Sequence, residues 1–189
     1  MPKYRVRFNS PTVLTFSLIA VVIYFINRIV PGFTLKLFAA PPSISWGQPL
    51  DYFRLVSHVA GHASWGHLLG NLAYILLLGP LLEEKYGSST LTLMMAVTAV
   101  VTGLVNAALF STGLLGASGI VFMFIILASM ADARKGTIPL TFILVAMIFI
   151  GTELVNALRA DNISQSAHLI GGGLGAAFGS TWTKHRRKS

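Results

Sequence analysis

The chain has 189 residues, of which 54% are hydrophobic and only 11% are charged, and its formal net charge at pH 7 is +8. Soluble domains carry about 25% charged residues, so this composition excludes an ordinary water-soluble fold and predicts a membrane protein solvated by lipid. The basic residues stand in short runs beside apolar segments, which indicates membrane topology rather than a nucleic-acid partner. Without cysteine, the chain has no disulfide framework, thiol chemistry or cysteine-type zinc site.

Six membrane-spanning helices are predicted in an all-α fold, within one domain of residues 1–189 whose core covers about residues 11–182. The first is Pro11–Ile29, because residues 8–27 carry no charge and twenty helical residues rise about 30 Å, the thickness of a bilayer core. A cleaved signal peptide is less favoured here, since no small-residue cleavage pattern follows the run. The remaining spans are predicted at Trp65–Tyr86 and at residues 89–110, 118–131, 138–158 and 165–182.

Between the first two spans, residues 30–57 form a long segment that six prolines and glycines interrupt, at positions 31, 32, 41, 42, 47 and 49. Apolar and aromatic residues, among them Phe33, Trp46 and Phe53, lie between these breaks. Aromatic rings are favoured at the boundary between lipid and water, so we expect a partly structured loop at the membrane interface. Loops of this length are uncommon and are often functional.

Six spans place both termini on the same side of the membrane. Ten Lys and Arg residues, including the basic N- and C-terminal tails, then share that side, and only four fall on the other: Arg28, Lys36, Arg54 and Arg159. The positive-inside rule therefore predicts a multi-pass integral membrane protein with both termini in the cytoplasm.

The first polar cluster joins the interfacial segment to the second span, where His58, His62, His67 and Asn71 fall within fourteen positions. His67 and Asn71 are four residues apart and share a helix face. Because polar side chains inside a span usually face the bundle interior, the cluster is either a hydrogen-bonding network or part of a site. His58 and His62 also have the spacing of metal ligands, but no carboxylate lies nearby in sequence, and we expect no metal.

The second feature is a serine, Ser118, which opens the fourth span between Gly116 and Gly119. A lone serine in a span is often only a packing residue. The flanking glycines allow a sharp turn and the close approach of another chain, and a helix N-terminus directs free N–H groups toward an oxyanion. Ser118 is therefore a candidate nucleophile.

The third feature is His168 in the sixth span, three residues before a stripe of small residues at Gly171, Gly175 and Gly179. Such a stripe allows tight helix packing, so His168 is expected to face the helix that packs there. By itself it could be a structural hydrogen bonder. Opposite a glycine-flanked serine it is a candidate general base.

Together these residues suggest acyl transfer: Ser118 as nucleophile, His168 as base, and an oxyanion site made of His67, Asn71 and the Ser118 N–H. The nearest acidic residues to His168, Glu153 and Asp161, have no favourable spacing for a third member. The sequence therefore favours a Ser-His dyad over a triad, with no cofactor.

In their order and placement, these motifs resemble the rhomboid family of intramembrane serine proteases. The resemblance covers about residues 54–179 and rests on three patterns: His58, His62, His67 and Asn71; Gly116, Ser118 and Gly119; and Ala167, His168, Gly171 and Gly175. It implies hydrolysis of peptide bonds in or near the transmembrane segments of other membrane proteins. It also implies a compact prokaryotic form, in the cytoplasmic membrane.

The resemblance assigns further residues as well. Arg54 resembles the basic residue that anchors the first loop, and Glu83 resembles a buried carboxylate that ties helices together; an interfacial charge beside Lys85 is the alternative for Glu83. Where rhomboids often have a tyrosine packed on the catalytic histidine, this chain has Phe122, so the apolar face is kept without the hydroxyl.

Two other functions are open at this stage, and each has a feature against it. A catalytically dead relative would usually lack the serine or the histidine, and both are present. A small transporter would be expected to carry a mid-span acidic residue or a repeated half, and neither is found. For a protease, residues 162–166 together with the fifth span, which carries Gly151, are the candidate substrate gate, and the long first loop is the alternative.

Overall fold

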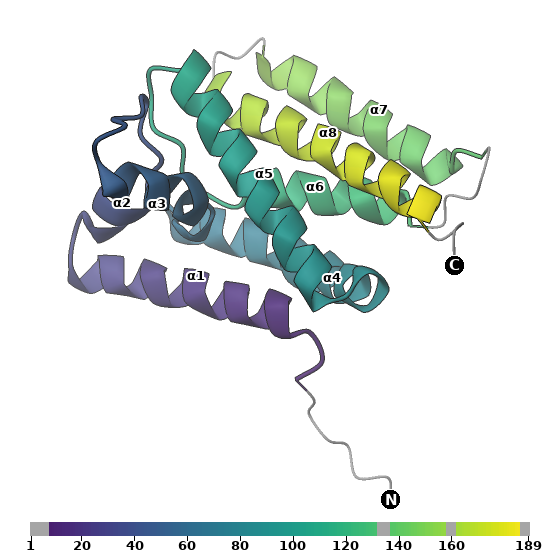
Figure 1. Ribbon diagram of the computed structural model, residues 1–189, viewed down its shortest axis with the longest axis horizontal. Coiled ribbons are helices and arrows are strands. Elements are labelled where there is room, and N and C mark those ends of the chain that lie inside the picture. The colour runs from purple at the N-terminus through teal and green to yellow at the C-terminus, as the bar shows by residue number, and fades with distance from the viewer. Residues whose placement is uncertain (1–7, 132–136, 158–161, 186–189) are drawn as a thin grey trace, which may run out of the picture.

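The computed structural model describes residues 8–131, 137–157 and 162–185, and these residues form a bundle of helices (Figure 1). In chain order the elements are α1 (Pro11–Ile29), α2 (Phe33–Phe38), α3 (Pro49–Ser57), the 3₁₀ turn η1 (His58–Ala60), α4 (Trp65–Tyr86), α5 (Ser88–Leu109), α6 (Ser118–Ser129), α7 (Leu140–Ala157) and α8 (Asn162–His185). Apart from a single β-bridge between Ala40 and Leu114, the described residues contain no strand. The all-helical fold class is confirmed.

The helix boundaries agree with the sequence where a local signal marks them. Helices α1 and α4 begin and end as predicted, because Pro11 opens the first and Gly87, with φ of 82°, ends the second. Among the described residues, α1, α4 and α5 are long and apolar enough to cross a membrane. Helix α6 has twelve residues and rises only about 18 Å, which is shorter than the bilayer core. The count of six spans stays a prediction.

The start of the last helix differs from the prediction. Helix α8 starts at Asn162, so residues 162–166 are its first turn and not a loop. The sequence does carry a signal for this start, because Asp161 directly precedes Asn162 and aspartate is a favoured N-cap residue type. The basic tails and Asp161 lie outside the described residues, and so does the side chain of Glu153.

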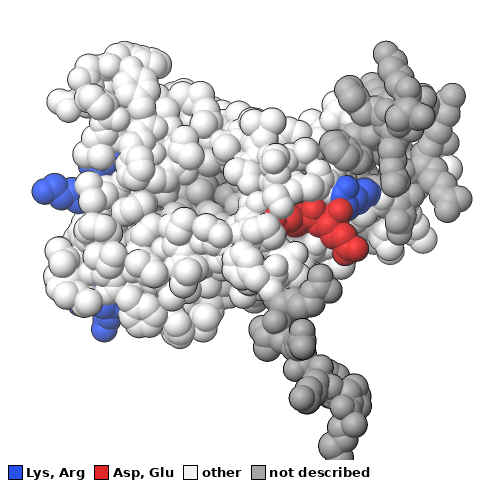
Figure 2. All heavy atoms as spheres, turned by 60° about the horizontal axis from the view of Figure 1, so that its bottom comes forward, with Lys and Arg blue, Asp and Glu red and all other residues white. Residues whose placement is uncertain are grey.

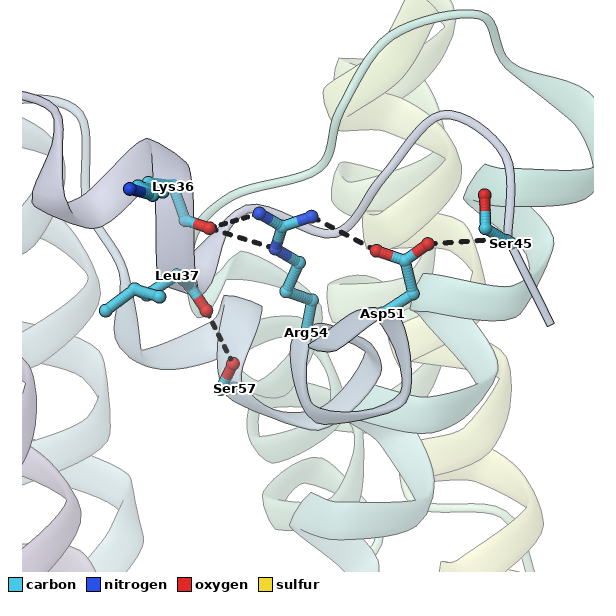
Figure 3. A network of polar contacts seen from close by, with 6 residues as sticks. All are labelled: Lys36, Leu37, Ser45, Asp51, Arg54 and Ser57. Carbon is cyan, nitrogen blue, oxygen red and sulfur yellow. Dashed lines mark hydrogen bonds and ion pairs between the residues drawn. The ribbon is translucent and has the colours of Figure 1, made fainter. Parts of the chain in front are cut away.

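The segment of residues 30–57 contains the two short helices α2 and α3, which are held together by the Arg54 side chain (Figure 3). The Arg54 guanidinium donates hydrogen bonds to the carbonyl oxygen of Lys36 in α2 and forms an ion pair, at 3.1 Å, with Asp51 in α3. The second carboxylate oxygen of Asp51 accepts the backbone N–H of Ser45 at 3.0 Å. Arg54 therefore connects the two helices and the loop between them.

Helix α1 is attached to α4 by close packing and by one carboxylate. A Cβ atom on Gly79 would lie 2.6 Å from Val13, so only glycine allows the two helices to approach this closely. The Ser10 side chain makes no capping hydrogen bond at the start of α1. Instead, the two carboxylate oxygens of Glu83 accept the backbone N–H groups of Thr12 and Val13, at 2.9 and 3.1 Å. Buried Glu83 thus satisfies the N-terminal donors of another helix.

Helix α6 lies in the middle of the bundle, with α7 and α8 on one side and α1 and α4 on the other (Figure 1). Its residues Ile120, Met123, Phe124 and Leu127 are fully buried. At the surface, the charged side chains gather at two ends of the molecule, with an uncharged belt between them on the face that Figure 2 shows. Such a belt is what a protein surrounded by hydrocarbon requires.

Candidate active site

A cavity of about 930 Å³ lies between helices α4, α6, α7 and α8. Its polar lining includes four residues from the N-terminal parts of α4 and α6 and from α8: His67, Asn71, Ser118 and His168. From Ser118 the cavity continues along α6 to Ser129, past mostly apolar side chains. The four residues that the sequence singles out for nucleophile, base and oxyanion donors therefore line one space, although they are up to 101 positions apart in the chain.

The turn before Ser118 depends on a glycine. Gly116 has φ of 118°, a conformation that residues with side chains rarely adopt, and its N–H donates to the carbonyl oxygen of His58 at 3.0 Å. A Cβ atom on Gly116 would lie 2.5 Å from the His67 ring, so the backbone packs directly against that imidazole. Ser118 follows as the first residue of α6, in the turn whose N–H groups have no acceptor within the helix.

His168 reaches the cavity because α6 and α8 approach each other at two glycines. A Cβ atom on Gly171 would overlap the carbonyl oxygen of Gly119, the residue after Ser118. One turn further along, a Cβ atom on Gly175 would lie 2.6 Å from the carbonyl oxygen of Met123. The ring of Phe122 lies against the His168 ring, with 4.2 Å between centroids. The aromatic face expected at this position is thus present.

His58 and His62 lie behind the cavity wall, and both are 1% exposed. His62 approaches the Ala60 carbonyl oxygen through Nδ1, at 3.3 Å, and Asn71 Nδ2 through Nε2, at 3.0 Å. Since a carbonyl can only accept, Nδ1 carries the proton, and Nε2 accepts a hydrogen bond from the Asn71 amide. His58 is held in the same way, with Nδ1 at 3.1 Å from the Leu55 carbonyl oxygen.

These two histidines lie between α3 and α4, outside the helices that can span the membrane. Burial lowers the pKa of His58 to about 4, and burial together with the neighbouring His67 lowers the pKa of His62 to about 4. Both imidazoles are therefore neutral at pH 7 and serve as hydrogen-bonding supports. In the part of the chain that the structure describes, no three His, Asp or Glu side chains gather in a way that could hold a metal ion.

Comparison with known proteins identifies the family to which a chain with this arrangement belongs. The family model of the Rhomboid domain matches residues 49–185, which contain every residue of the cavity. The chain belongs to the rhomboid family.

Three similar proteins bear the name Rhomboid protease GlpG. The protein from Haemophilus influenzae (strain ATCC 51907 / DSM 11121 / KW20 / Rd) is 24% identical over 145 residues, which cover 75% of this chain and 76% of the relative. The one from Serratia proteamaculans (strain 568) is 28% identical over 182 residues, covering 94% and 64%. The one from Yersinia pestis (strain Pestoides F) is 30% identical over 113 residues, covering 60% and 40%. This rhomboid is accordingly an integral membrane protein of the intramembrane serine protease class.

Some residues that support the site of this rhomboid are not predicted from the sequence. Thr102 in α5 lies 3.4 Å from His58 Nε2, and the Asn106 side chain donates to the carbonyl oxygen of Thr112, in the loop that leads to Ser118. Both are buried, as is Thr98. Their spacing of four residues within an apolar span was a usable signal, because it places three polar side chains on one interior-facing stripe.

Proposed function

We propose that this rhomboid hydrolyses peptide bonds in or near the transmembrane segments of other membrane proteins, with Ser118 as nucleophile and His168 as general base. The observation that carries the proposal is that Ser118, His168, His67 and Asn71 line the same cavity. The test is cleavage of a single-span substrate by protein purified in detergent, together with labelling of Ser118 by a fluorophosphonate. The Ser118→Ala and His168→Ala variants are the decisive comparison.

The reaction proceeds in two acyl transfers. Ser118 Oγ attacks the scissile carbonyl carbon while His168 takes the hydroxyl proton, and a tetrahedral oxyanion forms. His168 then gives the proton to the leaving amine, the C–N bond breaks, and an acyl-enzyme remains. Water, deprotonated by His168, attacks this ester, and Ser118 is released with its proton restored. Phe122 and the Gly119–Gly171 approach support the position of His168 in this dyad.

The oxyanion is stabilised by the Ser118 N–H, at the N-terminus of α6, and by the side chains of His67 and Asn71. Asn71 uses one amide hydrogen for His62 and keeps the second for the oxyanion. His67 is held in place from behind by the backbone of Gly116. Such donors are effective because they are already oriented before the charge develops.

Gly116→Ala tests the support of His67. The new methyl group would displace the imidazole and strain a backbone with φ of 118°. We expect kcat to fall about 10²-fold or more, the size of the effect when one oxyanion donor is lost. Gly66→Ala is the matched control, since a Cβ atom there meets nothing within 4 Å. Steady-state kinetics with an unchanged kcat in Gly116→Ala would contradict the assignment of His67.

Substrates are proposed to enter between α4 and α7. The cavity lies between these helices, and in the part of the chain described no Cα atom of α4 lies within 8 Å of one in α7, whereas α7 packs against α6 and α8. This retains the fifth span as the moving element of the gate. Residues 162–166 belong to α8 and have no separate place in it.

Cross-linking tests the gate. Because the chain has no natural cysteine, a thiol-reactive linker reacts only with the introduced ones. In a Leu77→Cys/Ile148→Cys double variant, a reducible bifunctional linker would join α4 to α7 across the cavity. We expect cleavage of the transmembrane substrate to be lost on linking and restored by reductant, while each single-cysteine variant stays active. Full cleavage by the linked protein would exclude this route.

The termini are proposed to lie in the cytoplasm of a prokaryotic cell, because ten of the fourteen Lys and Arg residues then lie on the cytoplasmic side. A membrane-impermeant maleimide applied to intact cells is expected to label Gly47→Cys and to spare Ser189→Cys. Labelling of Ser189→Cys without labelling of Gly47→Cys would show the opposite topology.

A further inference from the structure

A second cavity, of about 610 Å³, lies on the other side of α6, between α1, α3 and α5. We call it the α1–α5 groove. Its floor is buried and includes the small side chains Ala60 and Ala99 together with Ile120 of α6. Its rim is exposed, with Ile19 on α1 at 47% and Val56 on α3 at 43%. Small residues at the floor leave a hollow that larger side chains would have filled.

The lining of the groove is suited to hydrocarbon. It contains no charged residue. Three of its four hydroxyl groups have partners within the protein: Thr92 donates to the Ser88 carbonyl oxygen at 2.8 Å, Thr12 lies 3.0 Å from Thr92, and Ser57 lies 3.5 Å from the Leu37 carbonyl oxygen. An occupant that makes hydrogen bonds would therefore lose its bonds with water and gain few in return.

The groove is short for a second membrane-spanning helix. Among its lining residues, Thr12 approaches Thr92 at 3.0 Å, and the Phe38 and Phe53 rings have 5.8 Å between centroids. Along α5 the lining runs from Thr92 to Ala99, a rise of about 10 Å. A membrane-spanning helix is about 10 Å across and about 30 Å long, so it would extend well beyond this lining. A single flexible chain fits a groove of this length.

We propose that the α1–α5 groove binds one acyl chain of a membrane phospholipid. The rhomboid is an integral membrane protein, so the open side faces lipid tails, and burying each methylene of a chain is favourable. The occupant would contact Ile120, two residues after Ser118, and Val59 and Ala60, which follow His58. It would thus support, from behind, the two segments that shape the candidate active site. Only this last consequence rests on the proposed function.

The binding test uses the full-length protein, reconstituted with a phosphatidylethanolamine that carries a diazirine in its acyl chain. After illumination, mass spectrometry identifies the labelled peptides. We expect the label to concentrate on exposed groove residues such as Ile19 and Val56. Ala96→Trp fills the groove from α5 and should reduce that labelling about tenfold, whereas Ala108→Trp, exposed on the same helix outside the groove, should not. If Ala96→Trp does not fold, the smaller substitution Ala96→Leu replaces it in the labelling test.

Label spread evenly around the bundle, or undiminished in folded Ala96→Trp or Ala96→Leu, would overturn the proposal. So would efficient cross-linking between two copies through a Thr15→Cys variant, because it would put a second chain at the mouth. A separate measurement of cleavage tests the effect of the lipid on activity. Removal of lipid should slow cleavage by the wild type and have less effect on Ala96→Trp. If groove labelling is specific but no variant cleaves a substrate, the lipid site stands and the proposed function fails.

Discussion

Ser118→Ala and His168→Ala are each expected to lower kcat/KM for a single-span substrate by about 10⁴-fold or more, because removing either member of a nucleophile–base pair disables both acyl-transfer steps. The effect should fall on kcat, since substrate is held by the rest of the cavity. Fluorophosphonate labelling should vanish in both variants. Thermal unfolding should stay close to that of the wild type, because neither truncation introduces a clash.

Ser129→Ala is the matched control for Ser118. Ser129 belongs to the same helix and lines the same cavity, but its hydroxyl donates to the carbonyl oxygen of Ile126 at 2.7 Å. We expect its removal to leave cleavage and labelling nearly unchanged. Cleavage that persists in Ser118→Ala, or a loss in Ser129→Ala as large as that in Ser118→Ala, would refute the assignment of the nucleophile.

The second large effect is expected from Gly171→Ala, which probes the approach of α8 to α6. The added methyl group would overlap the carbonyl oxygen of Gly119, and a backbone oxygen can move only if α6 moves with it. We expect the free energy of unfolding to fall by about 3 kcal/mol, at the upper end of the cost of overpacking. Cleavage should be lost as well, since His168 would move away from Ser118.

Gly173→Ala separates this clash from the general effect of replacing glycine in a helix. Gly173 is exposed on α8, and a Cβ atom there meets nothing within 4 Å. Alanine in a helix is favoured over glycine by about 0.5–1 kcal/mol, so this variant should be slightly more stable than the wild type. Unfolding in detergent, followed for both variants, checks the pair. Equal stability of the two would show that the helices can separate at little cost.

Prediction from the sequence succeeds where the signal is local. Pro11 and Gly87 mark helix ends because they restrict or extend the backbone at their own positions, and α1 and α4 follow them to the residue. The helices α2 and α3 have weaker local marks, and their placement depends on contacts such as the hydrogen bonds from Arg54 to the Lys36 carbonyl oxygen and the Ala40–Leu114 bridge. Those contacts join residues that composition and periodicity cannot pair.

The same division applies to the candidate site. The sequence by itself determined a helical membrane protein and the residue types for acyl transfer, because apolar runs, flanking glycines and polar residues inside spans carry that information locally. Only the tertiary structure decided that Ser118, His168, His67 and Asn71 line one cavity. It does so through contacts between distant backbones, of Gly171 with Gly119 and of Gly116 with His67, where the absence of a side chain allows two segments to approach. It also placed Glu83 at the N-terminus of α1 and left the α1–α5 groove of about 610 Å³, neither of which follows from spacing along the chain.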